Sequence, residues 1–179
     1  MCIRDSALLN DEDLRTLIGL LCESEVKVRR LSAATVTWGG NQNAPDGGLD
    51  VRVALQENDA IDGFVPRPQT GFQVKKPDMS RVDILAEMRP NGTLRPVIRN
   101  LADSSGAYII VCSAGSTSDT ALQRRHNAMR EAIQDLPNAD NLALDFYDRG
   151  RIATWVRDHA GLVLWVRNKI CLLYTSRCV

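Results

Sequence analysis

Residues 107–112, Ala107-Tyr108-Ile109-Ile110-Val111-Cys112, form a compact apolar run in the second half of the chain. A short, uninterrupted run of this kind is typical of a β-strand that is buried on both faces. Helical patterns flank it, over residues 96–103 before it and over residues 119–136 after it. We therefore expect a central strand in a layered α/β domain.

Strands and helices alternate along the rest of the chain as well. The further strands that the sequence predicts cover residues 49–55, 71–75 and 142–147. In the first of them Val51, Val53 and Leu55 share one face, as expected of a half-buried strand. The further predicted helices cover residues 10–25, 77–88 and 151–159. Residues 26–37 are expected to be extended, residues 38–48 to form a loop, and residues 162–166 to form a last apolar segment.

Two short motifs carry the polar residues of chemical interest. Asp46-Gly47-Gly48-Leu49-Asp50 leads from a loop into the strand at 49–55, and Gln73-Val74-Lys75 lies in the strand at 71–75. Residues two apart in a strand point to the same face, so Gln73 and Lys75 lie together while Val74 points into the core. If the two strands pair, a carboxylate, an amide oxygen and an ammonium group converge at one end of a sheet.

Phosphodiester cleavage requires such a set of groups. Carboxylate and other oxygen ligands hold a hard divalent cation, usually Mg²⁺, which keeps several of its waters. The cation polarises the phosphoryl oxygen and lowers the pKa of a bound water. A lysine can orient that water and neutralise charge in the transition state. The sequence thus points to a metal-dependent hydrolase built around Asp50, Gln73 and Lys75.

The order D-G-G-L-D and then Q-V-K resembles the PD-(D/E)xK nucleases, and most closely the Mrr-like restriction endonucleases. The resemblance covers residues 11–159 and implies a restriction-endonuclease-like three-layer α/β/α domain with a central mixed sheet. It implies that Asp50 is the metal-binding carboxylate, that Gln73 replaces the usual second acid as a ligand, and that Lys75 is the catalytic lysine. An acid on the first helix often completes such a site. Glu12 is the candidate for this third ligand, and Asp13 is the alternative.

The resemblance implies a Mg²⁺-dependent DNA endonuclease from a prokaryote, acting in restriction or antiphage defence with double-stranded DNA as its substrate. Such domains often begin larger proteins that carry sensor or NTP-hydrolysing domains, and a homo-oligomer is compatible with the resemblance. Two alternatives stay open. Gln73 favours a degenerate nuclease fold that binds nucleic acid without cutting it. A protein-interaction domain would be favoured if Asp50 and Lys75 failed to converge.

The two ends of the chain do not read as parts of this domain. Residues 1–5 can be back-translated to ATG TGT ATA AGA GAC, and residues 171–179 to TGT CTC TTA TAC ACA TCT AGA TGT GTA, with synonymous codons chosen to match. Read on the opposite strand, the first string lies inside the second, and the shared word resembles the mosaic-end adapter of transposase-based sequencing libraries. We expect residues 1–6 and 171–179 to be adapter-derived scars that pack poorly, and residues 7–170 to be a nuclease domain truncated at its C-terminus.

Composition excludes several classes of function. Removing Arg4, Asp5 and Arg177 with the scars from the 22 basic and 22 acidic residues leaves 20 and 21, a net charge of −1, so the domain is not a polybasic binder. No run approaches the roughly 18 apolar residues of a membrane helix, and the P-loop pattern is absent. Outside the scars, Cys22 and Cys112 have neither disulfide-framework nor metal-ligand spacing. This favours a cytoplasmic protein without a membrane partner.

Overall fold

The computed structural model describes residues 8–39, 49–59 and 61–175, with side chains as far as Cys171. The Asp46-Gly47-Gly48 part of the first motif and the expected scar at residues 1–6 lie outside the described residues. The described helices are α1 (Asp11–Val28), α2 (Arg81–Met88), α3 (Pro96–Asp103), α4 (Asp119–Ile133), α5 (Arg149–Arg157) and α6 (Ala160–Thr175). The described strands are β1 (Val36–Trp38), β2 (Val51–Ala54), β3 (Gln69–Lys75), β4 (Ala107–Cys112) and β5 (Ala143–Tyr147).

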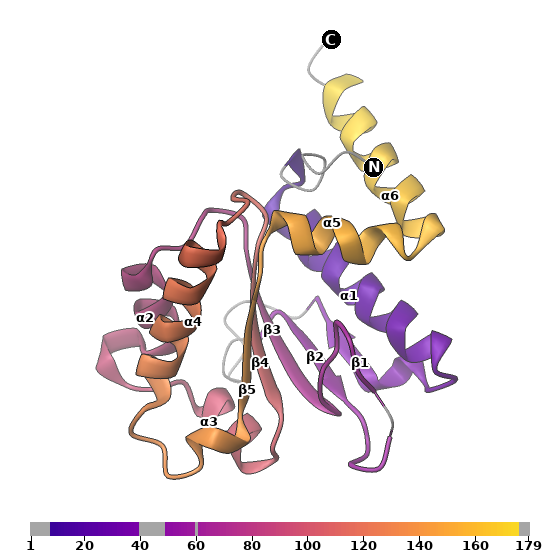
Figure 1. Cartoon of the computed structure of the whole chain (residues 1–179). Coiled ribbons are helices and arrows are strands. Elements are labelled where there is room, and N and C mark those ends of the chain that lie inside the picture. Colours follow the sequence, from indigo (N-terminus) through magenta and orange to yellow (C-terminus); the bar gives the residue numbers. More distant parts are fainter. Residues whose placement is uncertain (1–7, 40–48, 60, 176–179) are drawn as a thin grey trace.

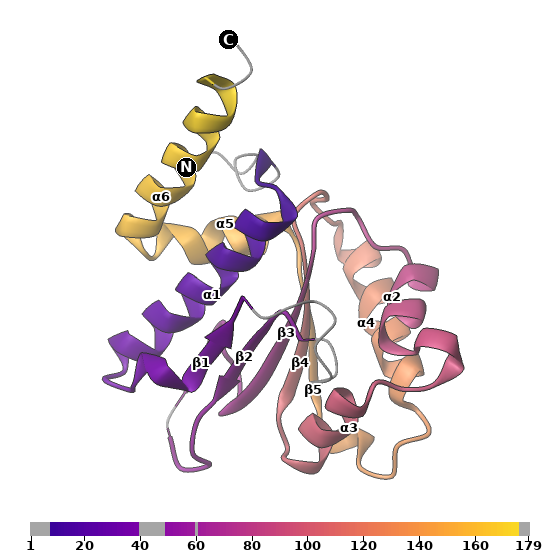
Figure 2. The same cartoon turned by 180° about the vertical axis from the view of Figure 1, so that it is seen from behind.

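The strands form one mixed sheet in the order β1-β2-β3-β4-β5. The pairs β1–β2 and β2–β3 are antiparallel, whereas β3–β4 and β4–β5 are parallel. Helices α2, α3 and α4 cover one face of the sheet, and α1, α5 and α6 lie on the other side (Figure 1), as the view from behind also shows (Figure 2). The expected three-layer α/β/α architecture with a central mixed sheet is therefore confirmed.

Buried side chains fill the space on both faces of the sheet. One apolar core packs α1 and α5 against the sheet face that carries Val53, Phe72 and Val74. The other packs α2, α3 and α4 against the face that carries Tyr108 and Ile110. All residues of β4 are buried, as the apolar run predicts, because helices cover this strand on both sides. In β2 the buried Val51 and Val53 alternate with exposed residues, also as predicted.

Helix α1 is longer than expected. The sequence predicts its end near residues 23–25 and an extended segment over 26–37, but the helix continues to Val28 and only Val36–Trp38 form a strand. The reason is that Val26 continues the apolar stripe of Ile18 and Cys22 at intervals of four residues, and all three are fully buried. Burial on the core face outweighs the weak preference of a β-branched residue for extended structure.

Helix α2 begins later than expected. The predicted start at Pro77 is wrong, because Ser80 and Asp83 form a reciprocal capping box and fix the first helical residue at Arg81. Helix α4 ends at Ile133 rather than near residue 136. These shifts leave the order of the elements as predicted.

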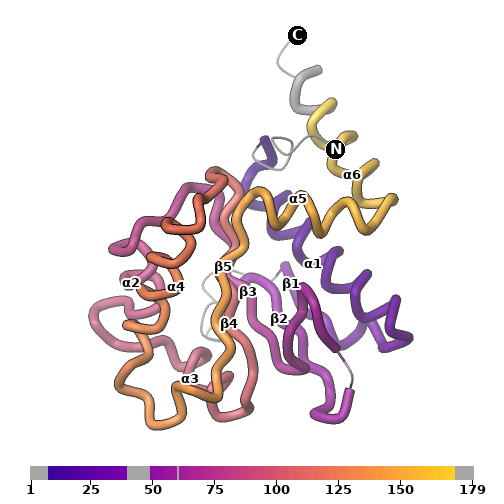
Figure 3. Tube along the Cα trace, in the orientation of Figure 1, coloured from indigo at the N-terminus to yellow at the C-terminus, as the bar shows by residue number. Residues whose placement is uncertain are grey.

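The apolar segment at 162–166 is part of α6, which leads away from the sheet beyond α5 (Figure 3). Val166 is its fully buried residue, and Cys171 is exposed. The backbone of α6 continues to Thr175, so the helix extends into the expected scar while the side chains from residue 172 on lie outside the described part. Along the described segments, no helix combines the length and apolar character needed to cross a membrane.

Candidate active site

The pairing of β2 with β3 brings the two sequence motifs together. Because these strands are antiparallel, the start of β2 lies beside the end of β3, with Val51 opposite Phe72. The ladder continues one residue further, where Asp50 N donates to Phe72 O at 3.0 Å. Asp50 therefore enters the sheet next to Gln73 and Lys75, while Val74 is buried in the core on the opposite face.

The carboxylate of Asp50 is mostly buried and its Oδ2 accepts two hydrogen bonds. Val74 N donates to it at 2.7 Å and Gln73 Nε2 at 2.8 Å. Arg15 of α1 lies on the other side, with Nη1 3.7 Å from Oδ1. Burial raises the pKa of Asp50, and the Val74 hydrogen bond and the charges of Arg15 and Lys75 oppose this rise. A nearby cation would therefore stabilise the ionised form of this carboxylate.

Gln73 presents an unused oxygen beside this carboxylate. The residue is 5% exposed, and its Oε1 is buried without a hydrogen-bond partner. An ionised carboxylate can only accept hydrogen bonds, so the amide NH₂ of Gln73 must face Asp50 and the oxygen must face away from it. A buried acceptor without a partner costs free energy. A bound cation or an ordered water would satisfy it.

The ammonium group of Lys75 is paired with a carboxylate. Its Nζ lies 2.9 Å from Oε2 of Glu87, a residue of α2 whose side chain is 12% exposed. Arg95 contacts the same glutamate, with Nη2 2.8 Å from Oε1 and Nε donating to the main-chain oxygen at 2.6 Å. Lys75, Glu87 and Arg95 form a chain of ion pairs beside Asp50.

These side chains line one cleft of about 1080 Å³. Helix α1 contributes Glu12 and Arg15 to the wall of this cleft. Asp13 instead pairs with Lys169 of α6, and its Oδ1 lies 2.8 Å from Lys169 Nζ. The structure therefore brings Glu12 to the cleft with Asp50, Gln73 and Lys75 and turns Asp13 away from it. The predicted roles of these residues in binding a metal and in catalysis stay predictions.

The donor set limits the kind of metal site that the cleft can provide. Within the part of the chain that the structure describes, no group of three histidine, cysteine, aspartate or glutamate side chains is arranged to hold a metal. A closed protein cage for Zn²⁺ is therefore not present among these residues. The available oxygens are those of Asp50, the buried Oε1 of Gln73 and, from the wall, Glu12. A hard cation that keeps several waters, as Mg²⁺ does, fits such a sparse set.

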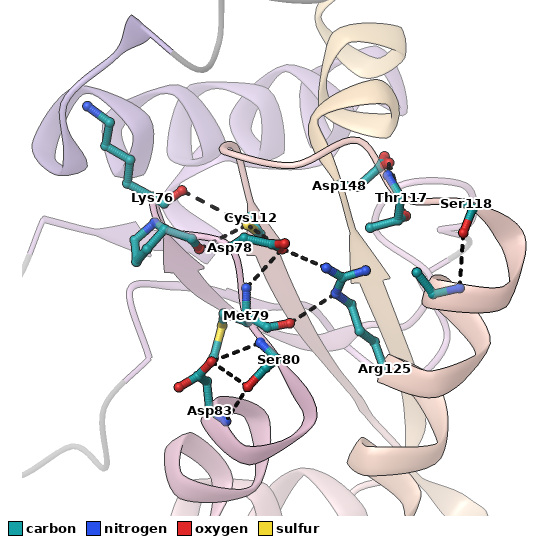
Figure 4. A network of polar contacts seen from close by, with 12 residues as sticks. Lys76, Asp78, Met79, Ser80, Asp83, Cys112, Thr117, Ser118, Arg125 and Asp148 are labelled. Atoms are coloured by element: carbon teal, nitrogen blue, oxygen red, sulfur yellow. Dashed lines mark hydrogen bonds and ion pairs between the residues drawn. The ribbon is translucent and has the colours of Figure 1, made fainter.

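The turn after β3 is anchored from two sides (Figure 4). Arg125 of α4 donates from Nη2 to Asp78 Oδ1 at 2.6 Å. The thiol of Cys112, at the end of β4, donates to the main-chain oxygen of Pro77 at 3.0 Å. These contacts hold the chain directly after Lys75, so the lysine leaves the sheet from a fixed strand end.

Comparisons of the chain with protein-family models, with curated proteins and with solved structures find no match.

Sequence reasoning missed Glu87 and Arg95. The helix that carries Glu87 is predicted, but its contact with Lys75 depends on how α2 folds back over the sheet, which no local pattern reveals. The sequence does contain a weak signal. An acid in the last turn of a helix is unfavourable for the helix dipole, which suggests that another interaction retains Glu87 there.

Proposed function

We propose that this domain is a Mg²⁺-dependent DNA endonuclease of the Mrr-like kind. The observation that carries the proposal is the buried, unpartnered Oε1 of Gln73 beside the carboxylate of Asp50, with Lys75 in the same cleft. Oxygen ligands next to an ammonium group are the requirement of metal-assisted phosphodiester hydrolysis. The α/β/α layering agrees with the fold that the resemblance implies.

Asp50 and Gln73 would hold the cation, with Glu12 of α1 as the third ligand. When bound, Mg²⁺ would polarise a phosphoryl oxygen and lower the pKa of a water. Lys75 donates hydrogen bonds and carries a positive charge, so it can orient the attacking water and offset the charge that develops on the phosphate. Hydrolysis adds the water oxygen to phosphorus and breaks one P–O ester bond, and the departing oxygen takes up a proton.

The cleft suits an anionic polymer because basic side chains share its walls with the acids. Arg15, Arg52, Lys75 and Arg95 all line it. Contacts to phosphate give affinity without reading sequence, so these residues support a nucleic acid as the substrate class. The choice of double-stranded DNA comes from the resemblance to the Mrr-like endonucleases. The free, buried thiols of Cys22 and Cys112 support a cytoplasmic protein. Further sensor or NTP-hydrolysing domains and a defence role belong to the same proposal.

The test is nicking of supercoiled plasmid DNA in Mg²⁺ and in EDTA. Cleavage is expected only with Mg²⁺, and Asp50→Ala should abolish it by removing a ligand carboxylate. Lys75→Ala should also abolish it but leave Mg²⁺ affinity nearly unchanged, because an ammonium group is not a metal ligand. Gln73→Glu should preserve activity and tighten Mg²⁺ binding, since it adds a charge that faces the cation.

The matched control is Lys27→Ala, which removes a lysine that pairs with Glu23 on the exposed side of α1. It should cut like the wild type. Equal cleavage by wild type and Lys75→Ala would contradict the proposal, because the site would then do no chemistry.

A second candidate is a degenerate nuclease fold that binds DNA without cutting it. The hydrogen bond from Gln73 to Asp50 favours it, because this bond occupies one oxygen of the carboxylate that a cation needs. DNA binding without Mg²⁺-dependent nicking would support this candidate. The alternative of a protein-interaction domain loses its main argument, since Asp50 and Lys75 do line one cleft.

A further inference from the structure

We propose that Glu87 is a positioning residue that sets the place of the Lys75 ammonium group in the active site, and that Arg95 holds Glu87 for this purpose. The inference rests on the proposed nuclease function, in which Lys75 acts on the attacking water. It assigns a role to a residue of α2 that lies outside both sequence motifs.

The first step is the geometry of the carboxylate. Oε2 of Glu87 lies 2.9 Å from Lys75 Nζ, and Oε1 lies 2.8 Å from Arg95 Nη2. Each oxygen therefore has its own cationic partner. A carboxylate engaged in this way is poorly placed to be a metal ligand, and its effect on the reaction has to pass through Lys75.

The second step is the support of Glu87 itself. Helix α2 ends at Met88, so the main-chain oxygen of Glu87 is one of the last carbonyls of the helix, which lack a partner in a following α-helical turn. Arg95 Nε donates to this oxygen at 2.6 Å, and Arg95 N donates to Met88 O at 3.0 Å. Arg95 thus binds the main chain and the side chain of Glu87 together and fixes its orientation.

The third step is the surrounding electrostatics. Tyr108 of β4 is fully buried and its hydroxyl has no partner among the described residues. Burial and the negative charges of Glu87 and Asp50 raise the pKa of Tyr108, so it stays neutral. The neutral Tyr108 hydroxyl therefore adds no charge near Glu87. The Glu87 side chain is 12% exposed, so its ion pair with Lys75 is screened less by salt and water than an ion pair on the surface.

The consequence concerns the freedom of Lys75. A lysine side chain on a strand end has many rotamers of similar energy, and holding it in one place has an entropic cost. Glu87 restricts the ammonium group before substrate arrives, on the side of the cleft that it shares with Asp50. Misplacing a catalytic group by about 1 Å can cost roughly 100-fold in rate, so the constraint matters for catalysis.

The experiment uses the full chain and first measures the contact itself. Ammonium protons of lysine are seen in ¹H–¹⁵N NMR spectra when a lasting ion pair slows their exchange with water. A signal that Lys75→Arg removes should be present in the wild type and lost in Glu87→Gln. The control Glu131→Gln also removes one carboxylate with an arginine partner, Arg81, and should leave the signal in place.

The second measurement is single-turnover cleavage. Glu87→Gln should lower the rate by about 100-fold, with the dissociation constants for Mg²⁺ and DNA close to those of the wild type. Glu131→Gln should cut at the wild-type rate.

Several outcomes would overturn the inference. One is an unchanged Lys75 signal in Glu87→Gln, and another is an unchanged cleavage rate. Loss of Mg²⁺ binding in Glu87→Gln would instead identify a metal ligand. If the wild type does not cut DNA at all, the proposed function fails, whereas the NMR signal still decides whether Glu87 holds Lys75. Thermal unfolding of each variant separates these outcomes from loss of the fold.

Discussion

At the scale of single residues, Asp50 lies in a place that disfavours the charged form of its carboxyl group. Burial raises its pKa above the value of about 3.9 that an unfolded chain shows. The folded protein therefore binds this proton more tightly than the unfolded chain does. The tighter binding of the proton stabilises the folded protein. This stabilisation is present in full at low pH and is lost as the pH rises through the folded-state pKa. At neutral pH the metal-free protein is thus less stable than it would be with a neutral side chain here.

We predict that Asp50→Asn raises the melting temperature of the metal-free protein at neutral pH. Asparagine keeps an oxygen that can accept the Val74 hydrogen bond but has no charge to bury. The gain should shrink as the pH falls toward about 4, since the wild-type carboxyl then carries a proton. Thermal unfolding in EDTA over a series of pH values measures it. The exposed Asp140→Asn serves as the control, and a variant less stable than wild type at neutral pH would refute the prediction.

At the scale of elements, helix α1 and strand β1 pack closely against each other at Gly19. A Cβ added to Gly19 would lie 2.4 Å from Cγ of Trp38, so only glycine admits this ring against the helix. The ring is also held by a hydrogen bond from Trp38 Nε1 to Glu23 Oε1 at 2.9 Å. Because Trp38 lines the cleft, this contact fixes one wall of the candidate site.

We predict that Gly19→Ala destabilises the protein, although alanine is the better helix former by about 1 kcal/mol. Forcing a rigid indole out of a packed position costs about 1–3 kcal/mol and outweighs that gain. Urea unfolding measures the difference. The control is Gly161→Ala in α6, where an added Cβ meets no atom within 4 Å and stability should be kept or slightly raised. Equal stability of the two variants would show that Trp38 can move at little cost.

At the scale of the whole molecule, a buried carboxylate joins the first helix to the C-terminal part of the domain. Glu25 of α1 accepts a hydrogen bond from Trp155 Nε1 at 2.8 Å, and His159 Nε2 lies 3.2 Å from the same oxygen. Its other oxygen pairs with Arg29 Nη1 at 2.6 Å. The three partners come from α1 and from α5 and its end. This network ties α1, with Glu12 and Arg15 at its other end, to α5.

We predict that Glu25→Ala lowers the free energy of unfolding by about 3–5 kcal/mol, the cost of removing one partner of a buried ion pair. Trp155 would keep a buried donor without its acceptor, and Arg29 would lose one of its two carboxylate partners, the other being Asp62. The urea midpoint, measured by circular dichroism and by tryptophan fluorescence, reports the change. Glu57→Ala, at an exposed position, should change stability by no more than about 0.5 kcal/mol. An unchanged midpoint in Glu25→Ala would mean that α1 is held by apolar packing alone.

The sequence by itself determined the layered α/β architecture and the face on which Gln73 and Lys75 lie. Strand periodicity is local, so the alternation around Val51 and the placement of Gln73 and Lys75 on one face follow from spacing alone. The uninterrupted apolar run of β4 likewise predicts a strand covered on both sides. Such patterns record how much of each side chain is buried.

Only the tertiary structure decided which charged groups become neighbours. Glu87 reaches Lys75 because α2 packs back onto the sheet, and Asp13 is turned to Lys169 because α6 returns to α1. It also decided that Val26 continues a helix, because a core face was there to bury it. The physical reason is that a local pattern fixes how far a side chain is buried, whereas its partner depends on contacts between distant segments, and these form only when the layers pack.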